Sequence, residues 1–174
     1  MNRIILLFCL VLSLSACTSK FQKVLKNKDT DYKVKMAEKY FAEKKYINAQ
    51  QLFESVIQFV KGTPRYEELY LMYANSYYYD KDYDNAENIY KTFIEYFPNS
   101  AKVEEVEFMR AYTYYKRSPK AELDQTTTNR AMQLMQSFID AHPTSTRVKE
   151  ASDVIDACRA KLELKDYKTA TLYY

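Results

Sequence analysis

The sequence has one glycine, one histidine and no tryptophan among its 174 residues. Glycine-rich phosphate loops and hairpin-dense β folds need many positions with positive φ or close backbone approach, so a single glycine excludes them. One histidine and three cysteines provide few ligands for a metal site and few residues for a Cys–His nucleophile pair. A formal net charge of +3, with basic and acidic residues interspersed, does not indicate nucleic-acid binding. We therefore expect helices joined by short turns, and no catalytic residues, metal or nucleic acid.

Tyrosine is the residue type in excess. The chain contains 18 tyrosines and 9 phenylalanines, and aromatic residues make up 16% of the sequence. The length suits one domain, since globular domains usually have about 50 to 250 residues. The function of so many tyrosines is therefore the main question that the composition raises.

The amino terminus, over residues 1–16, is typical of a signal peptide. Arg3 supplies a positive charge, residues 4–12 are apolar, and Leu14-Ser15-Ala16-Cys17 resembles a bacterial lipoprotein box. The apolar run is too short for a membrane-spanning helix, which needs about 20 such residues. An ordinary secretory signal with a cysteine near its end is the alternative. We predict cleavage before Cys17, followed by attachment of diacylglycerol and an N-acyl chain to this cysteine.

Residues 17–30 are predicted to form a lipidated tether beside the membrane. The tether is rich in lysine, with Lys20, Lys23, Lys26 and Lys28. Several acyl chains anchor a protein stably, whereas one chain alone is marginal. Thr18 stands where an aspartate retains bacterial lipoproteins in the inner membrane, so by this resemblance we expect the outer membrane. No cofactor other than the covalent lipid is expected.

The remainder, residues 31–174, repeats itself at an interval of 37 residues. The pattern Ala-x-x-Tyr begins at Ala37, Ala74 and Ala111. A second small residue follows at Ala49, Ala86 and Ala131, the last displaced by an eight-residue insertion. Each unit reads as two antiparallel helices that cannot bury their apolar face alone, so neighbouring units must stack. The pattern resembles the tetratricopeptide repeat, which implies an all-α fold, a tetratricopeptide-like α-solenoid of antiparallel helix pairs.

Helices are predicted at 31–44, 46–60, 65–79, 83–96, 101–116, 128–141 and from about 145 to the end. These form repeats at 31–64, 67–100 and 104–143, followed by the first helix of a fourth repeat at 145–174. The insertion, within residues 117–128, is predicted to be a polar surface loop. Ala170-x-x-Tyr173 repeats the helix signature, so we expect the sequence to stop within the fourth repeat of a longer protein. A second helix that starts near residue 166 is the alternative.

Several tyrosines fall where tetratricopeptide repeats line a concave groove. The groove candidates are Phe41, Leu71, Asn75, Tyr78, Tyr79, Phe108, Tyr112 and Tyr115. Tyrosine offers a large contact area at a modest cost in rotamer entropy, so this surface suits an extended peptide with aromatic side chains. Packing against neighbouring helices or a partner domain is the alternative. His142 is predicted to be an exposed or capping residue, and Cys158 a buried one.

The lipid box, the tether and the repeats together resemble the BamD family of β-barrel assembly lipoproteins. The more specific residues are 138–145 (Phe-Ile-Asp-Ala-His-Pro-Thr-Ser), the insertion Ser118-Pro119 to Gln125, and residues 159–174. The resemblance implies a non-enzymatic scaffold on the periplasmic side of the outer membrane. It also implies two partners, a BamA-like barrel subunit and unfolded outer-membrane proteins. Another repeat lipoprotein, such as a secretin pilotin or an envelope scaffold, is the alternative.

Overall fold

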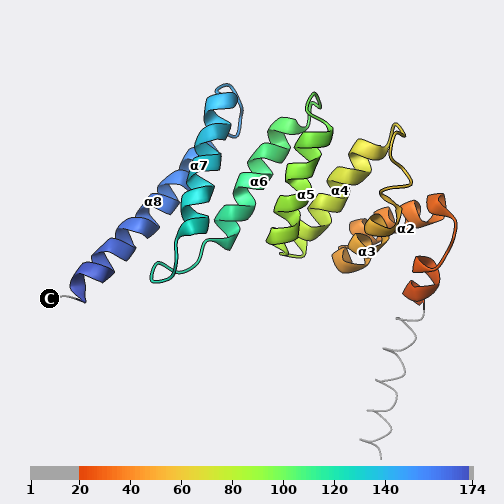
Figure 1. Cartoon of the computed structure of the whole chain (residues 1–174), viewed down its shortest axis with the longest axis horizontal. Helices are drawn as coiled ribbons and strands as arrows, with labels where there is room; N and C mark the ends of the chain where they lie inside the picture. The colour runs from red at the N-terminus through yellow and green to blue at the C-terminus, as the bar shows by residue number, and fades with distance from the viewer. Residues whose placement is uncertain (1–19, 173–174) are drawn as a thin grey trace, which may run out of the picture. The chain divides into compact units, whose positions relative to one another are not determined.

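The computed structural model describes residues 20–172, and all regular elements within that range are helices (Figure 1). A short helical segment at residues 20–25 precedes α2 (Thr30–Ala42), α3 (Tyr46–Val56), α4 (Tyr66–Tyr79), α5 (Tyr83–Tyr96), α6 (Val103–Arg117), α7 (Thr126–Ala141) and α8 (Val148–Thr171). The all-α prediction is confirmed, and most helix boundaries agree within three residues. The largest difference is that α3 ends at Val56, four residues early. The predicted signal peptide and Cys17 lie outside the described residues.

The helices belong to two compact units, divided between Ser76 and Tyr77 near the end of α4. In the first unit α2 packs against α3. Ala37 and Ala49 are both 0% exposed at this contact layer, where a small side chain lets two helix backbones approach closely. Phe53 of α3 fills the adjacent space, and its ring centroid lies 6.4 Å from that of Tyr73 on α4. The repeat positions identified in the sequence therefore form the core of this unit.

The predicted tether is partly folded onto the first unit. Residues 20–25 are helical, and the ring of Phe21 lies edge-on to Tyr40 of α2, with 5.8 Å between the centroids. Val24 is only 8% exposed. The tether prediction missed this contact because four lysines dominate the composition, whereas two apolar residues one turn apart decide the packing.

In the second unit α5, α6, α7 and α8 pack in sequence order, each against the next (Figure 1). Ala86, Ala111 and Ala131, the small repeat residues of this unit, are all fully buried. Tyr90 and Met135 each lie four residues after such an alanine, and both are also completely buried. The packing of adjacent antiparallel helices around these positions is that of a tetratricopeptide-like solenoid.

The repeat extends to the backbone of the turn after the first helix of the first two pairs. Lys44 and Lys81, 37 residues apart, both adopt the left-handed conformation, with φ of 59° and 67°. This conformation ends a helix sharply but is costly for a residue with a Cβ atom. After the second turn Asp82 caps α5, since its carboxylate accepts a hydrogen bond from the backbone N–H of Asn85 at 3.2 Å.

The last helix, α8, runs without a break from Val148 to Thr171. It therefore passes through residues 166–170, where the alternative reading placed the start of a second helix. Its first half is buried through Ala151, Val154, Ile155 and Cys158. Burial also raises the pKa of the Cys158 thiol, which agrees with the prediction of a buried residue. None of the helices in residues 20–172 is both long and apolar enough to cross a membrane.

Candidate peptide-binding wall

Five of the eight groove candidates lie in the second unit, on two helices. Tyr78 and Tyr79 end α4, whereas Phe108, Tyr112 and Tyr115 follow one face of α6 at intervals of four and three residues. The rings of Tyr78 and Tyr79 meet edge to face with 5.5 Å between centroids. Those of Tyr112 and Tyr115 are also 5.5 Å apart. Each helix thus contributes a pair of touching tyrosine rings.

Phe108 belongs to the core rather than to an open groove. Its side chain is 1% exposed, and its ring meets Phe138 of α7 edge-on at 5.5 Å. The guanidinium of Arg147, at the start of α8, lies 4.4 Å from the ring centroid. The sequence pattern could not show that α7 and the α7–α8 turn cover this position. Phe108 instead supports the wall, because Tyr112 stacks on it at 5.6 Å with 20° between the ring planes.

The four tyrosines Tyr78, Tyr79, Tyr112 and Tyr115 are called the aromatic wall below. Tyr79 is 50% exposed, and the other three are half-buried. The ammonium of Lys116 lies 4.8 Å from the ring centroid of Tyr112, a cation–π contact that covers part of that ring. The wall therefore offers rings that are held in place by neighbours yet remain partly accessible.

Tyr78 of the aromatic wall is uncharged at neutral pH. Burial raises the pKa of Tyr78 to about 12, and the nearby hydroxyls of Tyr112, Tyr83 and Tyr79 and the carboxylate of Glu150 act in the same direction. The phenol of Tyr78 therefore keeps its proton and can both donate and accept a hydrogen bond. An apolar ring surface with neutral hydroxyls can bind a peptide without desolvating a charge.

The other three candidates lie in the first unit. Phe41 of α2 and Leu71 and Asn75 of α4 are all half-buried. The ring of Phe41 meets Tyr46, the first residue of α3, edge-on at 5.7 Å. Leu71 and Asn75 are four positions apart and so share one face of α4.

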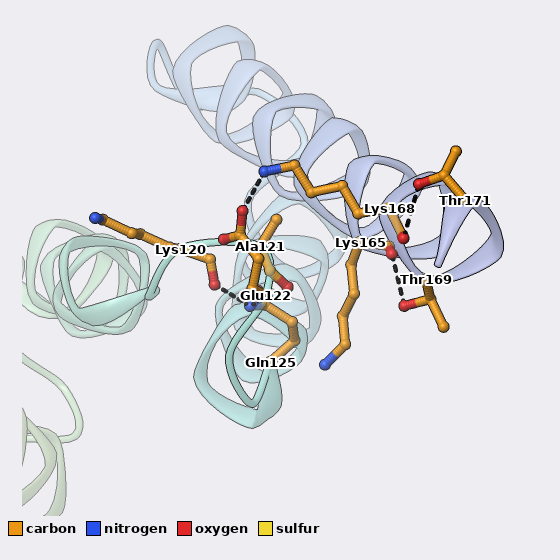
Figure 2. A network of polar contacts seen from close by, with 8 residues as sticks. All are labelled: Lys120, Ala121, Glu122, Gln125, Lys165, Lys168, Thr169 and Thr171. Carbon is orange, nitrogen blue, oxygen red and sulfur yellow. Dashed lines mark hydrogen bonds and ion pairs between the residues drawn. The ribbon is translucent and has the colours of Figure 1, made fainter. Parts of the chain in front are cut away.

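The insertion between α6 and α7 is a loop over residues 118–125, with Lys120, Glu122 and Asp124 exposed as predicted, but part of it is buried. Ala121, Gln125 and Thr128 are buried, and α7 already begins at Thr126. The side-chain amide of Gln125 donates to three backbone carbonyls, those of Lys120 at 2.8 Å, Ala121 at 3.3 Å and Leu123 at 3.1 Å. One glutamine thus organises the loop by satisfying carbonyls that face inward (Figure 2).

Three lysines of α8 hold the same loop from outside. Lys161 donates to the backbone carbonyl of Ser118 at 3.3 Å and to its hydroxyl at 2.6 Å. Lys165 donates to the carbonyl of Leu123 at 2.8 Å. Lys168 forms an ion pair with Glu122 (Figure 2). Sequence analysis missed these contacts. The available signal was the i, i+4, i+7 spacing of the lysines, which places them on one helix face.

The turn between α7 and α8 is bound to the first turns of α6. His142 is the C-cap residue of α7, is half-buried, and has Nε2 2.6 Å from Oε2 of Glu107. The hydroxyl of Ser145 donates to the carboxylate of Glu104 at 2.5 Å. His142 therefore has a capping position, and its ring connects the end of α7 to the start of α6 within the third repeat. Residues 20–172 contain no group of His, Cys, Asp and Glu side chains that could hold a metal ion.

The chain matches a known family model over residues 26–174. The matching family model is YfiO, described as an outer membrane lipoprotein. The chain belongs to the YfiO family of outer membrane lipoproteins. The YfiO match includes every helix from α2 to α8, and therefore all eight groove candidates. No curated protein matches the chain at a significant level.

Proposed function

We propose that this YfiO-family chain is a non-catalytic scaffold of β-barrel assembly, attached to the periplasmic side of the outer membrane by lipid on Cys17. The family match over residues 26–174 is the observation that carries the proposal. The Leu14-Ser15-Ala16-Cys17 box supports lipidation, and Thr18 after the cysteine supports the outer membrane. The buried alanine layers support a scaffold, since the repeats present surfaces built from several helices.

The aromatic wall is proposed to bind unfolded outer-membrane protein precursors as extended segments. Its rings are partly accessible, neutral and fixed by ring–ring contacts, so little conformational entropy is lost when a ligand binds. Aromatic side chains of the precursor can add further edge-to-face pairs with Tyr78, Tyr79 and Tyr115. A BamA-like barrel subunit is the second proposed partner, and no residue of this chain is assigned to it.

Peptide titration tests the aromatic wall. We expect Tyr78→Ala and Tyr115→Ala each to weaken binding of a peptide with a terminal aromatic residue. A lost aromatic pair is worth about 0.5–1.5 kcal/mol, which corresponds to roughly a two- to twelvefold rise in Kd. Tyr96→Ala is the matched control, because Tyr96 of α5 is 48% exposed and outside the wall. Unchanged affinity in both wall variants would refute the assignment.

Purification of the full-length lipoprotein from membranes tests the scaffold itself. Recovery of a BamA-like protein, together with mass spectrometric detection of acyl chains on Cys17, supports the proposal. Recovery of a secretin without a BamA-like protein would instead identify a pilotin. A Cys17→Ser chain that remains in the membrane fraction after a high-salt wash would contradict the lipid anchor.

A further inference from the structure

The strongest concentration of one charge lies in residues 20–28, called the lysine segment below. It contains four lysines and no acidic residue within nine positions. All four lysines, Lys20, Lys23, Lys26 and Lys28, are exposed. The nearest acidic residues are Asp29 and Asp31, and the Asp29 carboxylate is occupied as the N-cap of α2, where it accepts from the backbone N–H of Tyr32 at 3.0 Å. The lysine segment is therefore a local positive patch.

The lysine segment is attached to the first unit by its apolar residues. Phe21 contacts the ring of Tyr40, and Val24 is buried, so the helical turn cannot rotate freely about its own axis. After this turn, the side chain of Asn27 accepts a hydrogen bond from the backbone N–H of Asp29 at 2.8 Å, which fixes the entry into α2. The positive charges are consequently carried by a folded part of the first unit.

The distance along the chain places the lysine segment within reach of a bilayer surface. Lys20 follows Cys17 by three positions, and three residue steps span at most about 11 Å when fully extended. The screening length at physiological ionic strength is about 8 Å, which is of the same order. If Cys17 carries acyl chains, the first lysines lie within the electrostatic field of the lipid head groups.

We propose that the lysine segment binds the anionic phospholipid head groups of the bilayer that holds the Cys17 anchor. This contact orients the first unit on the membrane, because the ring of Phe21 packs against Tyr40 of α2 and Val24 is buried. The orienting role rests on the proposed lipidation of Cys17. Head-group binding depends only on the lysine segment and is tested without the lipid.

Vesicle partitioning tests the head-group contact. The probe is the mature chain from residue 17 with Cys17→Ser, which retains every described residue but neither signal nor anchor. We expect it to bind phosphatidylglycerol-containing vesicles, to bind phosphatidylcholine vesicles at least tenfold less, and to dissociate as salt is raised. Replacement of all four lysines of the segment by glutamine should reduce partitioning to the anionic vesicles at least tenfold.

A matched charge change serves as the control. Glutamine replacement of four exposed lysines of the second unit, Lys81, Lys91, Lys120 and Lys149, removes the same net charge away from the lysine segment. This control should retain partitioning within about twofold, since binding is local and not a response to net charge. An equal loss in both quadruple variants, or equal binding of the parent to the two vesicle types, would overturn the proposal.

The orienting role is tested on the lipidated chain in nanodiscs. A fluorophore at Glu54→Cys, an exposed position of α3, reports its distance from the bilayer by quenching. We expect the distribution of fluorophore–bilayer distances to be narrower in anionic than in neutral discs. The Val24→Asp variant, which retains all four lysines, should broaden the distribution in anionic discs. Identical distributions in both discs would refute orientation. If Cys17 proves unlipidated but the Cys17→Ser chain still binds anionic vesicles, the proposed anchor fails and head-group binding stands.

Discussion

Replacing Gln125 by alanine should destabilise the second unit by about 2–3 kcal/mol. The side chain is 4% exposed and donates to the carbonyls of Lys120, Ala121 and Leu123, and it accepts from the hydroxyl of Thr128 at 2.6 Å. An NH₂ group has two hydrogens, so two donated bonds and one accepted bond are counted. Each contributes about 0.5–1.5 kcal/mol. Thr128 retains one partner, since its hydroxyl lies 2.5 Å from that of Ser118.

Gln125→Glu is a sharper version of the same test. The shape is unchanged, but an ionised carboxylate would face three carbonyl oxygens in a buried site. Desolvation and these oxygens favour the protonated acid and raise its pKa above the ordinary value of about 4.3. Because the folded-state pKa is raised, the variant should approach the stability of the parent at low pH. It should lose stability relative to the parent as the pH rises through that raised value.

The assay is urea unfolding followed by circular dichroism, with parent and variants compared at each pH. Gln133→Ala is the control, because Gln133 lies on the same helix and is exposed. Its stability should remain within about 0.5 kcal/mol of the parent. A Gln125→Ala variant that is also within that range would refute the conclusion that this glutamine organises the loop. So would a Gln125→Glu variant whose stability relative to the parent does not depend on pH.

Two further predictions concern the turn and the wall. In urea unfolding, Lys81→Gly should raise the free energy of unfolding by about 1 kcal/mol, since glycine adopts the observed φ of 67° without strain. Lys91→Gly within α5 should lower the free energy of unfolding by a similar amount. A destabilised Lys81→Gly variant would contradict backbone strain at Lys81. The phenol of Tyr78 should remain protonated above the ordinary tyrosine pKa of about 10 and should titrate with a pKa of about 12. The measurement is NMR of isotope-labelled tyrosine, with the Tyr78 signal assigned from the Tyr78→Phe variant. Because this folded-state pKa is raised, the parent should lose stability relative to Tyr78→Phe as the pH rises from 10 to 12; an ordinary midpoint would contradict burial of the phenol.

The core positions of the repeats could be predicted, because small residues at a regular spacing mark the places where stacked helices approach closely. Ala37, Ala86 and Ala111 read as contact positions from spacing alone, and each is fully buried. The wall was predictable only in part. Leu71 is half-buried, but Phe108, at the equivalent repeat position 37 residues later, is buried. A repeat position specifies which side of a helix a residue occupies, and the neighbouring helices decide how much of that side remains open.

The sequence by itself determined the helix pairs and the buried alanine layers, because helical periodicity and repeat spacing are local properties of the chain. Only the tertiary structure showed that Gln125 and three lysines of α8 order the insertion. It alone also showed that Phe21 packs against Tyr40 of α2 and so attaches the lysine segment, and that His142 meets Glu107. These contacts join residues whose partners lie on other helices or across loops. Such contacts depend on the packing of whole elements, which no local pattern encodes.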